Sequence, residues 1–281
     1  MTTKPKTRTA APAPKAAPRL KAGGATPAPT PGDSYVQSFA RGLEVIRSFS
    51  AQAPQQTLSE VAARAGLTRA GARRILLTLQ QLGYVETDGK LFTLTPRILD
   101  LGFAYLSSMP IWNLAEPVME GLVAQVKESC SAAALDGTDI VYVMRVPTHK
   151  IMSISLGVGS RLPAYCTSLG RVLLAGLPDD EVRARLRASK RETLTRHTVT
   201  DVPALTAKVA QARKQGWSLV NQELEEGLIS LAAPLINRAG RTVAALNISG
   251  QANRTSAKVM QETMLPHLLE AARRISAVLG G

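Results

Sequence analysis

The pattern that most restricts the fold of this chain lies in its first hundred residues, where two short helices are joined by a tight turn. Thr57 and Glu60 have the spacing of a capping box, in which each side chain accepts the backbone amide hydrogen of the other residue, so a helix begins there. Gly66 ends that helix, and Thr68 is a good N-cap for a longer helix after it. Two short helices with a Gly-containing turn of this length indicate a helix-turn-helix.

A β-hairpin is expected after the second helix, which ends at Gly83. Residues 84–87 and 91–94 are strand-like runs on either side of Asp88-Gly89, a dipeptide that strongly indicates a hairpin turn. A globular pattern of apolar residues begins near residue 34. Together these elements predict a winged helix-turn-helix domain over residues 34–95, with the hairpin as its wing.

The second helix of the motif has one apolar and one basic face. One side of its helical wheel carries the apolar residues Ala72, Ile75, Leu76, Leu79 and Leu82. The other side carries Arg69, Ala70, Arg73, Arg74 and Gln80. Arginines at the start of such a helix fit the major groove of DNA, where they pair with guanine or contact phosphate. For any single arginine, a solvated basic face is the alternative.

We therefore expect double-stranded DNA as a partner of this domain. The residues expected to contact it from the second helix and its N-cap are Thr68, Arg69, Ala70, Arg73 and Arg74. Candidate phosphate contacts elsewhere in the domain are Gln37, Arg41 and Lys90. The formal net charge of +13 agrees with a polyanionic partner.

The N-terminal residues 1–33 are expected to form a disordered basic tail rich in Ala and Pro. Residues 1–32 contain six Lys and Arg and no acidic residue, with hardly a large apolar side chain among them. Such a segment cannot bury enough apolar surface to offset the entropy of ordering. Its charge suits contact with a polyanion, and a solubilising role is the alternative.

The remainder of the chain predicts a linker and a second domain. Residues 96–110 have apolar positions that suit a linker helix. Over residues 111–281 helical and strand patterns alternate, with turns at Asp136-Gly137 and Ala239-Gly240 between successive strands. This order indicates an antiparallel sheet flanked by helices, so the fold class is α+β.

The sequence gives little support for an enzyme, a metalloprotein or a membrane protein. Cys166 and His197 are the only nucleophile and base of the right types for acyl transfer, and no third orienting residue is indicated. The three histidines lack metal-ligand spacing, and residues 157–160 lack the further residues of a nucleotide loop. No apolar run reaches the roughly 18 residues that span a bilayer. We expect a cytoplasmic protein with no catalytic activity, cofactor or metal.

Over residues 34–278 the chain resembles the IclR family of bacterial regulators. Residues 58–62, 66–69 and 82–85 are similar to the family's helix-turn-helix and wing. Residues 161–171, 222–227, 231–234 and 245–249 resemble signatures of its effector domain. Residues 34–43 and the sequence Arg-Leu-Pro-Ala-Tyr-Cys-Thr at 161–167 resemble the subgroup that controls protocatechuate and 4-hydroxybenzoate catabolism, the β-ketoadipate pathway.

The resemblance implies a GAF-like domain over residues 111–281 that binds an effector and forms oligomers. It implies homodimers or tetramers that bind palindromic promoter operators. It also implies a small carboxylate effector, which we expect to be aromatic. A regulator of another carboxylate-catabolism operon and a ligand-independent DNA-binding dimer are the alternatives.

The resemblance also maps an effector pocket onto Ile151, Ile154, Ser168, Leu169, Val220, Asn221, Leu228, Ser230, Asn247 and Ser249. The residue types agree with this, since a helix start at Ser168 offers free amides to a carboxylate, and polar groups among apolar walls are usual in small-ligand sites. The alternative is that Ser and Asn satisfy local backbone groups. Arg145, which ends a strand just before Pro147, is a further candidate for holding the carboxylate, or else an exposed strand-end arginine.

Overall fold

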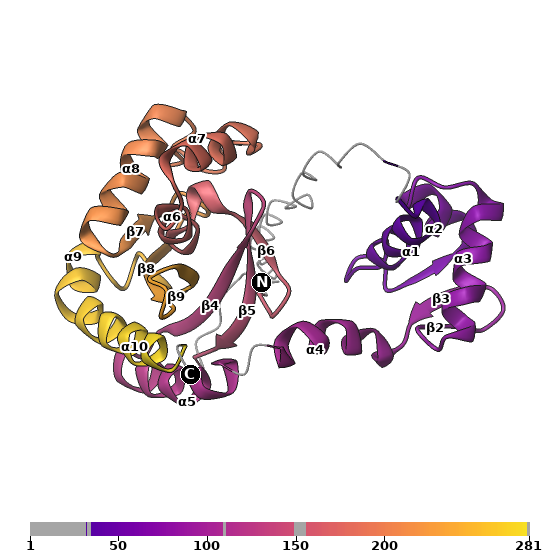
Figure 1. Cartoon of the computed structure of the whole chain (residues 1–281), viewed down its shortest axis with the longest axis horizontal. Helices are drawn as coiled ribbons and strands as arrows, with labels where there is room; N and C mark the ends of the chain where they lie inside the picture. The colour runs from indigo at the N-terminus through magenta and orange to yellow at the C-terminus, as the bar shows by residue number, and fades with distance from the viewer. Residues whose placement is uncertain (1–31, 33–34, 109–110, 149–155, 280–281) are drawn as a thin grey trace, which may run out of the picture.

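The computed structural model describes residue 32 and residues 35–108, 111–148 and 156–279. Figure 1 shows a small N-terminal unit and a larger C-terminal unit, with helix α4 (Leu99–Ser107) between them. The predicted α+β fold class is confirmed, since a helix-turn-helix unit precedes a curled antiparallel sheet with helices. The expected tail lies outside the described residues, apart from Gly32.

The N-terminal unit combines three helices with a small antiparallel sheet. The helices are α1 (Gln37–Arg47), α2 (Leu58–Arg64) and α3 (Arg69–Gln81). The sheet has the order β1-β3-β2, formed by β1 (Gln55–Thr57), β3 (Leu91–Leu94) and β2 (Val85–Thr87). Strand β1 is an addition to the expected hairpin, because three residues before a helix are too few to show a strand pattern in the sequence.

The starts of the two helices of the motif are fixed by the expected caps. Thr57 Oγ1 accepts a hydrogen bond from the Glu60 amide at 3.4 Å, and the Thr57 amide donates to Glu60 Oε2 at 2.8 Å. The hydrogen bond from the Thr57 amide, and after it one that the Thr57 hydroxyl donates to Glu60 Oε2 at 2.8 Å, lower the pKa of Glu60. Thr68 Oγ1 accepts from the Gly71 amide at 3.1 Å, so α3 begins where the sequence predicted.

The wing turn is held by the side chain of Asp88. Its Oδ1 accepts the amides of Lys90 at 2.8 Å and Leu91 at 2.7 Å, and these bonds lower the pKa of Asp88. Gly89 has a φ of +97°, a conformation that favours glycine. The Asp-Gly pair therefore closes the hairpin as expected, through an Asx turn that leaves Gly89 and Lys90 at its tip.

The C-terminal unit is built on one six-stranded sheet in which every neighbouring pair is antiparallel. Its order is β6-β5-β4-β9-β8-β7. In chain order, the strands are β4 (Ser129–Asp136), β5 (Asp139–Val146), β6 (Arg161–Pro163), β7 (Ser218–Asn221), β8 (Leu228–Ile236) and β9 (Thr242–Gln251).

Helices cover both faces of this sheet (Figure 1). One face packs against α5 (Ile111–Val126) and α10 (Leu265–Val278). The other packs against α6 (Ser168–Ala175), α7 (Asp179–Ala188) and α8 (Val202–Gln215). A short helical segment, η2 (Ala164–Cys166), leads into α6. Two more, α9 (Ala257–Val259) and η3 (Met260–Met264), lead into α10.

Alternation along β8 explains how one strand serves both layers. Ile229, Leu231 and Ala233 pack on the α5 and α10 side, whereas Ala232 packs on the α6 side. Ser230 shares the α6 side with Ala232, since both lie an even number of residues apart on the strand. A polar residue at this position is therefore buried beneath α6 rather than exposed to solvent.

No helix within the described ranges combines the length and apolarity needed to cross a membrane.

Candidate functional site

Helix α3 presents the basic face that the sequence predicted. Ala72, Leu76 and Leu79 are buried against the other helices of the unit. The residues expected to contact DNA from α3 and its N-cap, Thr68, Arg69, Ala70, Arg73 and Arg74, are all exposed. Burying the apolar stripe thus leaves the arginines directed to solvent on one helix face.

The candidate phosphate contacts outside α3 are exposed as well. Gln37 and Arg41 lie on α1, and Lys90 lies at the tip of the wing. Gly71 has a local explanation within the cap of α3, since a Cβ there would lie 3.2 Å from Thr68 Oγ1. Glycine therefore leaves room for the cap.

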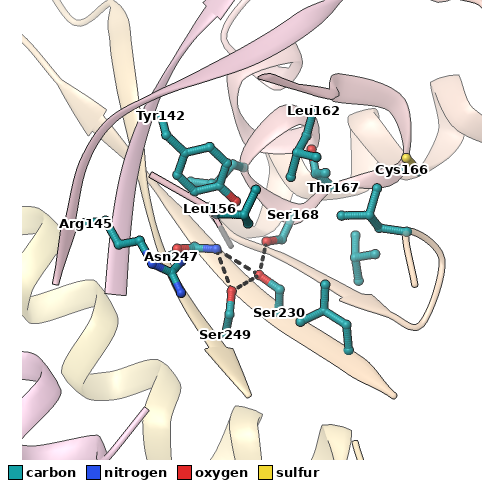
Figure 2. A pocket seen from close by; sticks show the side chains of 14 residues that line it. Tyr142, Arg145, Leu156, Leu162, Cys166, Thr167, Ser168, Ser230, Asn247 and Ser249 are labelled. Carbon is teal, nitrogen blue, oxygen red and sulfur yellow. Dashed lines mark hydrogen bonds between the residues drawn. The ribbon is translucent and has the colours of Figure 1, made fainter. Parts of the chain in front are cut away.

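A pocket lies in the C-terminal unit between the sheet and the start of α6 (Figure 2). The structure brings eight of the expected effector residues to this pocket: Arg145, Ser168, Leu169, Val220, Leu228, Ser230, Asn247 and Ser249. Six further residues line it: Tyr142, Leu156, Leu162, Cys166, Thr167 and Leu224. These residues come from strands β5, β7, β8 and β9, from α6 and from the segments beside them.

Four polar side chains form a hydrogen-bonded cluster across the floor of the pocket (Figure 2). Ser168 Oγ and Ser230 Oγ are 2.6 Å apart. Asn247 Nδ2 donates to Ser230 Oγ at 3.1 Å and to Ser249 Oγ at 2.9 Å. Ser249 Oγ is also 3.3 Å from Ser230 Oγ. The cluster therefore ties the first residue of α6 to two neighbouring strands.

The backbone of β4 fixes the orientation of the Asn247 amide. Asn247 Oδ1 accepts the amide hydrogen of Ser131 at 3.1 Å. With its oxygen turned to a backbone donor, the side chain must direct Nδ2 toward the serines. The pocket floor is therefore a set of oriented dipoles in a buried setting, where satisfied polar networks hold a defined geometry.

The start of α6 adds backbone donors beside this cluster. Thr167 is the N-cap, and its Oγ1 accepts the Gly170 amide at 3.1 Å while its carbonyl accepts the Arg171 amide at 3.0 Å. The amides of Ser168 and Leu169 come before the first intrahelical bond and so have no acceptor within the helix. Two donors at the positive end of a helix dipole suit an anion.

Arg145 supplies a cation at the edge of the same pocket. Its Nη1 donates to Ser131 Oγ at 3.3 Å, and no ion pair joins it to a carboxylate within the described part of the chain. Figure 2 shows its side chain beside Asn247. A half-buried guanidinium without an acidic partner is available to an anionic ligand.

A bulge in β5 puts Tyr142 and Arg145 on the same face of the sheet. Ala133 pairs with Tyr142, whereas Ala132 pairs with Met144, so Val143 is an extra residue in the strand. Residues three apart on a regular strand point to opposite faces. Tyr142 was not expected at the site, because the bulge cannot be seen in the sequence.

The walls of the pocket are apolar and its weak acids are neutral. Leu156, Leu162, Leu169, Leu224 and Leu228 line it. Burial raises the pKa of Tyr142 to about 12 and that of Cys166 to about 12. Both groups therefore remain protonated at neutral pH. The cavity is small, with a volume of about 30 Å³.

Two close contacts hold α6 behind the pocket. A Cβ at Gly170 would lie 2.2 Å from the carbonyl oxygen of Ala164, so only glycine allows this approach. Arg171 is buried, and its Nη2 lies 2.6 Å from Glu223 Oε2. Glu223 Oε2 also accepts the Val199 amide at 3.3 Å. The helix that carries the site is thus fixed from both sides.

Three expected effector residues are not brought to the pocket by the described structure. Ile151 and Ile154 lie outside the described residues. Asn221 is exposed at the end of β7, next to Val220, which does line the pocket. Since neighbouring strand residues point to opposite faces, Asn221 lies off the pocket wall that Val220 forms, and its role in effector binding stays a prediction.

The two residues considered for catalysis differ in burial and hydrogen-bond to other partners. Cys166 is buried, with its thiol 3.9 Å from the Pro163 carbonyl oxygen, whereas His197 is exposed and accepts from Arg196 Nε at 3.2 Å. In the described residues, no group of three or more His, Cys, Asp or Glu is arranged to hold a metal ion.

Comparison with known proteins matches both units. Residues 38–89 match the family model "IclR helix-turn-helix domain", and residues 103–277 match "Bacterial transcriptional regulator IclR C-terminal". The chain is 40% identical over 248 residues to the Pca regulon regulatory protein of Pseudomonas putida, covering 88% of this chain and 85% of that protein. It is 34% identical over 249 residues to the p-hydroxybenzoate hydroxylase transcriptional activator of Acinetobacter baylyi, covering 86% and 92%.

Solved structures agree over nearly the same length. The crystal structure of RHA06195 from Rhodococcus sp. RHA1 is 49% identical, with a TM-score of 0.78, covering 87% of this chain and 98% of that one. An IclR homolog from Microbacterium hydrocarbonoxydans, crystallised in complex with 4-hydroxybenzoate, is 26% identical with a TM-score of 0.76, covering 86% and 99%.

Proposed function

Because this chain belongs to the IclR family of bacterial transcriptional regulators, we propose that it controls genes of aromatic-acid catabolism. In this proposal a small aromatic acid from the protocatechuate and 4-hydroxybenzoate branch binds the C-terminal pocket and changes the affinity of the N-terminal unit for a promoter operator. Relatives named for the Pca regulon and for p-hydroxybenzoate hydroxylase support this choice of pathway.

The observation that carries the proposal is the division of the pocket into a polar floor and apolar walls. Arg145, the amides at the start of α6 and the Ser168–Ser230 cluster supply positive charge and hydrogen-bond donors. Leucine side chains face them from the walls. A carboxylate is costly to bury unless it is paired or hydrogen-bonded, and an aromatic ring is stabilised by apolar walls. An aromatic acid meets both conditions in one molecule.

The small size of the cavity supports a link between binding and conformation. A ring-sized acid must separate side chains that now close the space, and a carboxylate that reaches the polar floor meets the 2.6 Å contact between Ser168 and Ser230. We propose that the carboxylate takes over hydrogen bonds of this cluster, so α6 shifts relative to β8. A ligand changes DNA affinity only through such a difference between two conformations.

The exposed basic face of α3 supports major-groove binding by Arg69, Arg73 and Arg74. Thr68 and Ala70 lie at the same end of the helix, and Gln37, Arg41 and Lys90 are proposed to contact phosphates on either side. Because the partner is chromosomal DNA, the place of action is the bacterial cytoplasm. The pocket is assigned to binding and not to catalysis, with no cofactor or metal.

Apolar side chains left exposed on α1 and α4 support a homodimer. Val36 and Phe39, at the start of α1, are 62% and 68% exposed, and Leu99 and Phe103 of α4 are 70% and 67% exposed. On each helix the two side chains lie about one turn apart, and exposed apolar groups placed side by side in this way mark interaction surfaces. A two-fold dimer through these helices would present two copies of α3 to the halves of a palindromic operator, and dimers can pair further into tetramers.

Calorimetric titration of the full chain with 4-hydroxybenzoate, protocatechuate and β-ketoadipate tests the proposal. At least one of the two aromatic acids should bind to saturation, and the Ser168→Leu variant should not bind it. Saturation by β-ketoadipate alone, which has no ring, would instead make the effector an aliphatic dicarboxylate. Saturation only by acids of another pathway would favour a regulator of a different carboxylate operon. If the folded oligomer binds operator DNA but no acid, the ligand-independent DNA-binding dimer replaces the proposal.

A further inference from the structure

The segment that leads into α4 contacts the C-terminal end of the DNA-reading helix. Arg97, in the turn η1 (Pro96–Ile98) directly before α4, donates from Nη1 to the carbonyl oxygen of Leu82 at 2.9 Å. Leu82 is the C-cap of α3. The last carbonyls of a helix have no intrahelical donor and carry partial negative charge, so an arginine here is favourably placed.

Two neighbouring contacts define the same joint. Thr95 Oγ1 donates to the Gly83 carbonyl at 2.6 Å, and the Thr95 amide donates to the Tyr84 carbonyl at 3.0 Å. The Arg97 guanidinium also lies over the ring of Tyr84, 5.8 Å from its centre. The first residues after the wing therefore return to the end of α3 and bind it.

Gly83 makes room for this arrangement. A Cβ on Gly83 would lie 2.9 Å from Arg97 Nη1. Gly83 also has a φ of +81°, which ends α3 by bringing the Tyr84 amide to the Leu79 carbonyl at 2.8 Å. The positive φ is what requires glycine here, and the Arg97 guanidinium packs against the residue that ends the helix.

Any movement of α4 that reaches the DNA-binding unit along the chain must pass through residues 95–98. The covalent route from α4 back to α3 runs through β3, the wing turn and β2, and the pairing of Leu94 with Val85 joins the two strands at the α3 end of the hairpin. With the contacts of Thr95 and Arg97, the first turn of the linker is attached directly to the end of α3. A rotation of α4 then acts on α3 as well as on the wing.

We propose that Arg97 is a positioning residue that joins the linker helix α4 to the recognition helix α3, so the effector response passes to the DNA-reading arginines through this contact. The proposal rests on the proposed function, since it assumes an effector and an operator. Arg97 itself does not read DNA in this account. Its exposed contact adds little to stability, so its removal leaves the fold intact.

The test compares wild-type protein with Arg97→Ala, Arg97→Lys and the charge-matched control Arg254→Ala, an exposed arginine of the C-terminal unit. The DNA probe is a duplex selected by the wild-type chain from a random-sequence library, and the effector probe is 4-hydroxybenzoate or protocatechuate. Three quantities are measured: the ratio of operator Kd with and without effector, the Kd of the effector, and the salt dependence of operator binding.

In Arg97→Ala we expect the ratio of the operator Kd with effector to the operator Kd without it to move at least threefold closer to one. The effector Kd and the salt dependence of operator binding should stay unchanged. Arg97→Lys should restore part of the ratio, because a lysine keeps the charge at the helix end but loses the planar guanidinium. An unchanged ratio in Arg97→Ala would overturn the proposal. So would a preserved ratio with a salt slope reduced by about 0.9, since that result identifies Arg97 as a phosphate contact.

Amide hydrogen exchange separates this proposal from the proposed function. In Arg97→Ala the amide of Tyr84, at the end of α3, should exchange at least fivefold faster than in wild type, and in Arg254→Ala it should not. If the exchange rate is unchanged, the joint does not hold α3 and the proposal fails. If exchange accelerates while wild-type protein shows no effector response, the contact stands and the effector function is what fails.

Discussion

Ser168 Oγ and Ser230 Oγ lie 2.6 Å apart and connect the first residue of α6 to strand β8 at the floor of the pocket. Both side chains are buried, and Asn247 donates a further hydrogen bond to the Ser230 hydroxyl. Because this contact joins the first residue of α6 to β8, the polar floor, the helix amides and the packing of α6 depend on one another. A ligand that enters between them must change all three together.

Two substitutions at Ser168 distinguish the hydrogen bonds of its hydroxyl from the free space beside it. Ser168→Leu fills the cavity beside Ser230 and should abolish binding of an aromatic acid. Ser168→Ala keeps the backbone amide and removes one hydrogen bond, so we expect the Kd to rise about tenfold, which corresponds to about 1.4 kcal/mol. Calorimetry on both variants measures this, with circular dichroism as a control for folding. Wild-type affinity in Ser168→Leu would exclude this pocket.

Gly170→Ala tests the close approach of α6 to Ala164. The added Cβ would lie 2.2 Å from the Ala164 carbonyl oxygen and must move the backbone. We expect a loss of about 3 kcal/mol or more in the free energy of unfolding. The matched control is Gly121→Ala in α5, where a Cβ meets nothing within 4 Å and should add about 0.5 to 1 kcal/mol. Equal denaturation midpoints for the two variants would contradict the packing described for α6.

Among the described residues that line the pocket, no group should change its charge near neutral pH, so effector binding should follow the protonation of the acid. Because burial raises the pKa of Tyr142 and of Cys166 to about 12, both stay neutral between about pH 6 and about pH 8. Below about pH 5 the carboxylate of the effector takes up a proton, so its affinity should fall as the pH falls. Calorimetry from below pH 5 up to about pH 8 shows whether the affinity falls or rises as the pH falls. Tighter binding at low pH would mean that the neutral acid is the ligand.

The α3 arginines should divide into base contacts and phosphate contacts. Replacing a base-reading arginine by Ala should cost about 1–3 kcal/mol and relax specificity at one base pair. Replacing a phosphate-contacting one should weaken binding to all sequences and lower the salt slope by about one. Single variants at Arg69, Arg73 and Arg74, measured by fluorescence anisotropy, distinguish these roles. A triple variant with wild-type operator affinity would contradict the assignment of α3.

The sequence predicted best the features that depend on residues close together along the chain. The capping box of Thr57 and Glu60 and the turn at Asp88 are local patterns with one structural solution, and both are present. Three-residue β1 gave no such pattern, since its pairing with β3 depends on a partner more than thirty residues away.

The pocket depends on register, which local patterns do not contain. Tyr142 reaches it because of the extra residue Val143 in β5, and Asn221 misses it because it follows Val220 on the opposite face of β7. Cys166 and Leu224 also line the pocket. A strand pattern cannot indicate them, because they lie in turns whose positions are set by the packing of α6 and β7.

The most direct test of the account is the operator affinity of the full chain with and without a saturating aromatic acid, measured by fluorescence anisotropy on a duplex selected by the protein. We predict that 4-hydroxybenzoate or protocatechuate changes the operator Kd by about 5- to 150-fold, the usual range for coupling between two sites. The change should disappear in Ser168→Leu while DNA binding remains. An operator Kd that stays the same at saturating concentrations of both acids would contradict the claim that this pocket controls DNA binding.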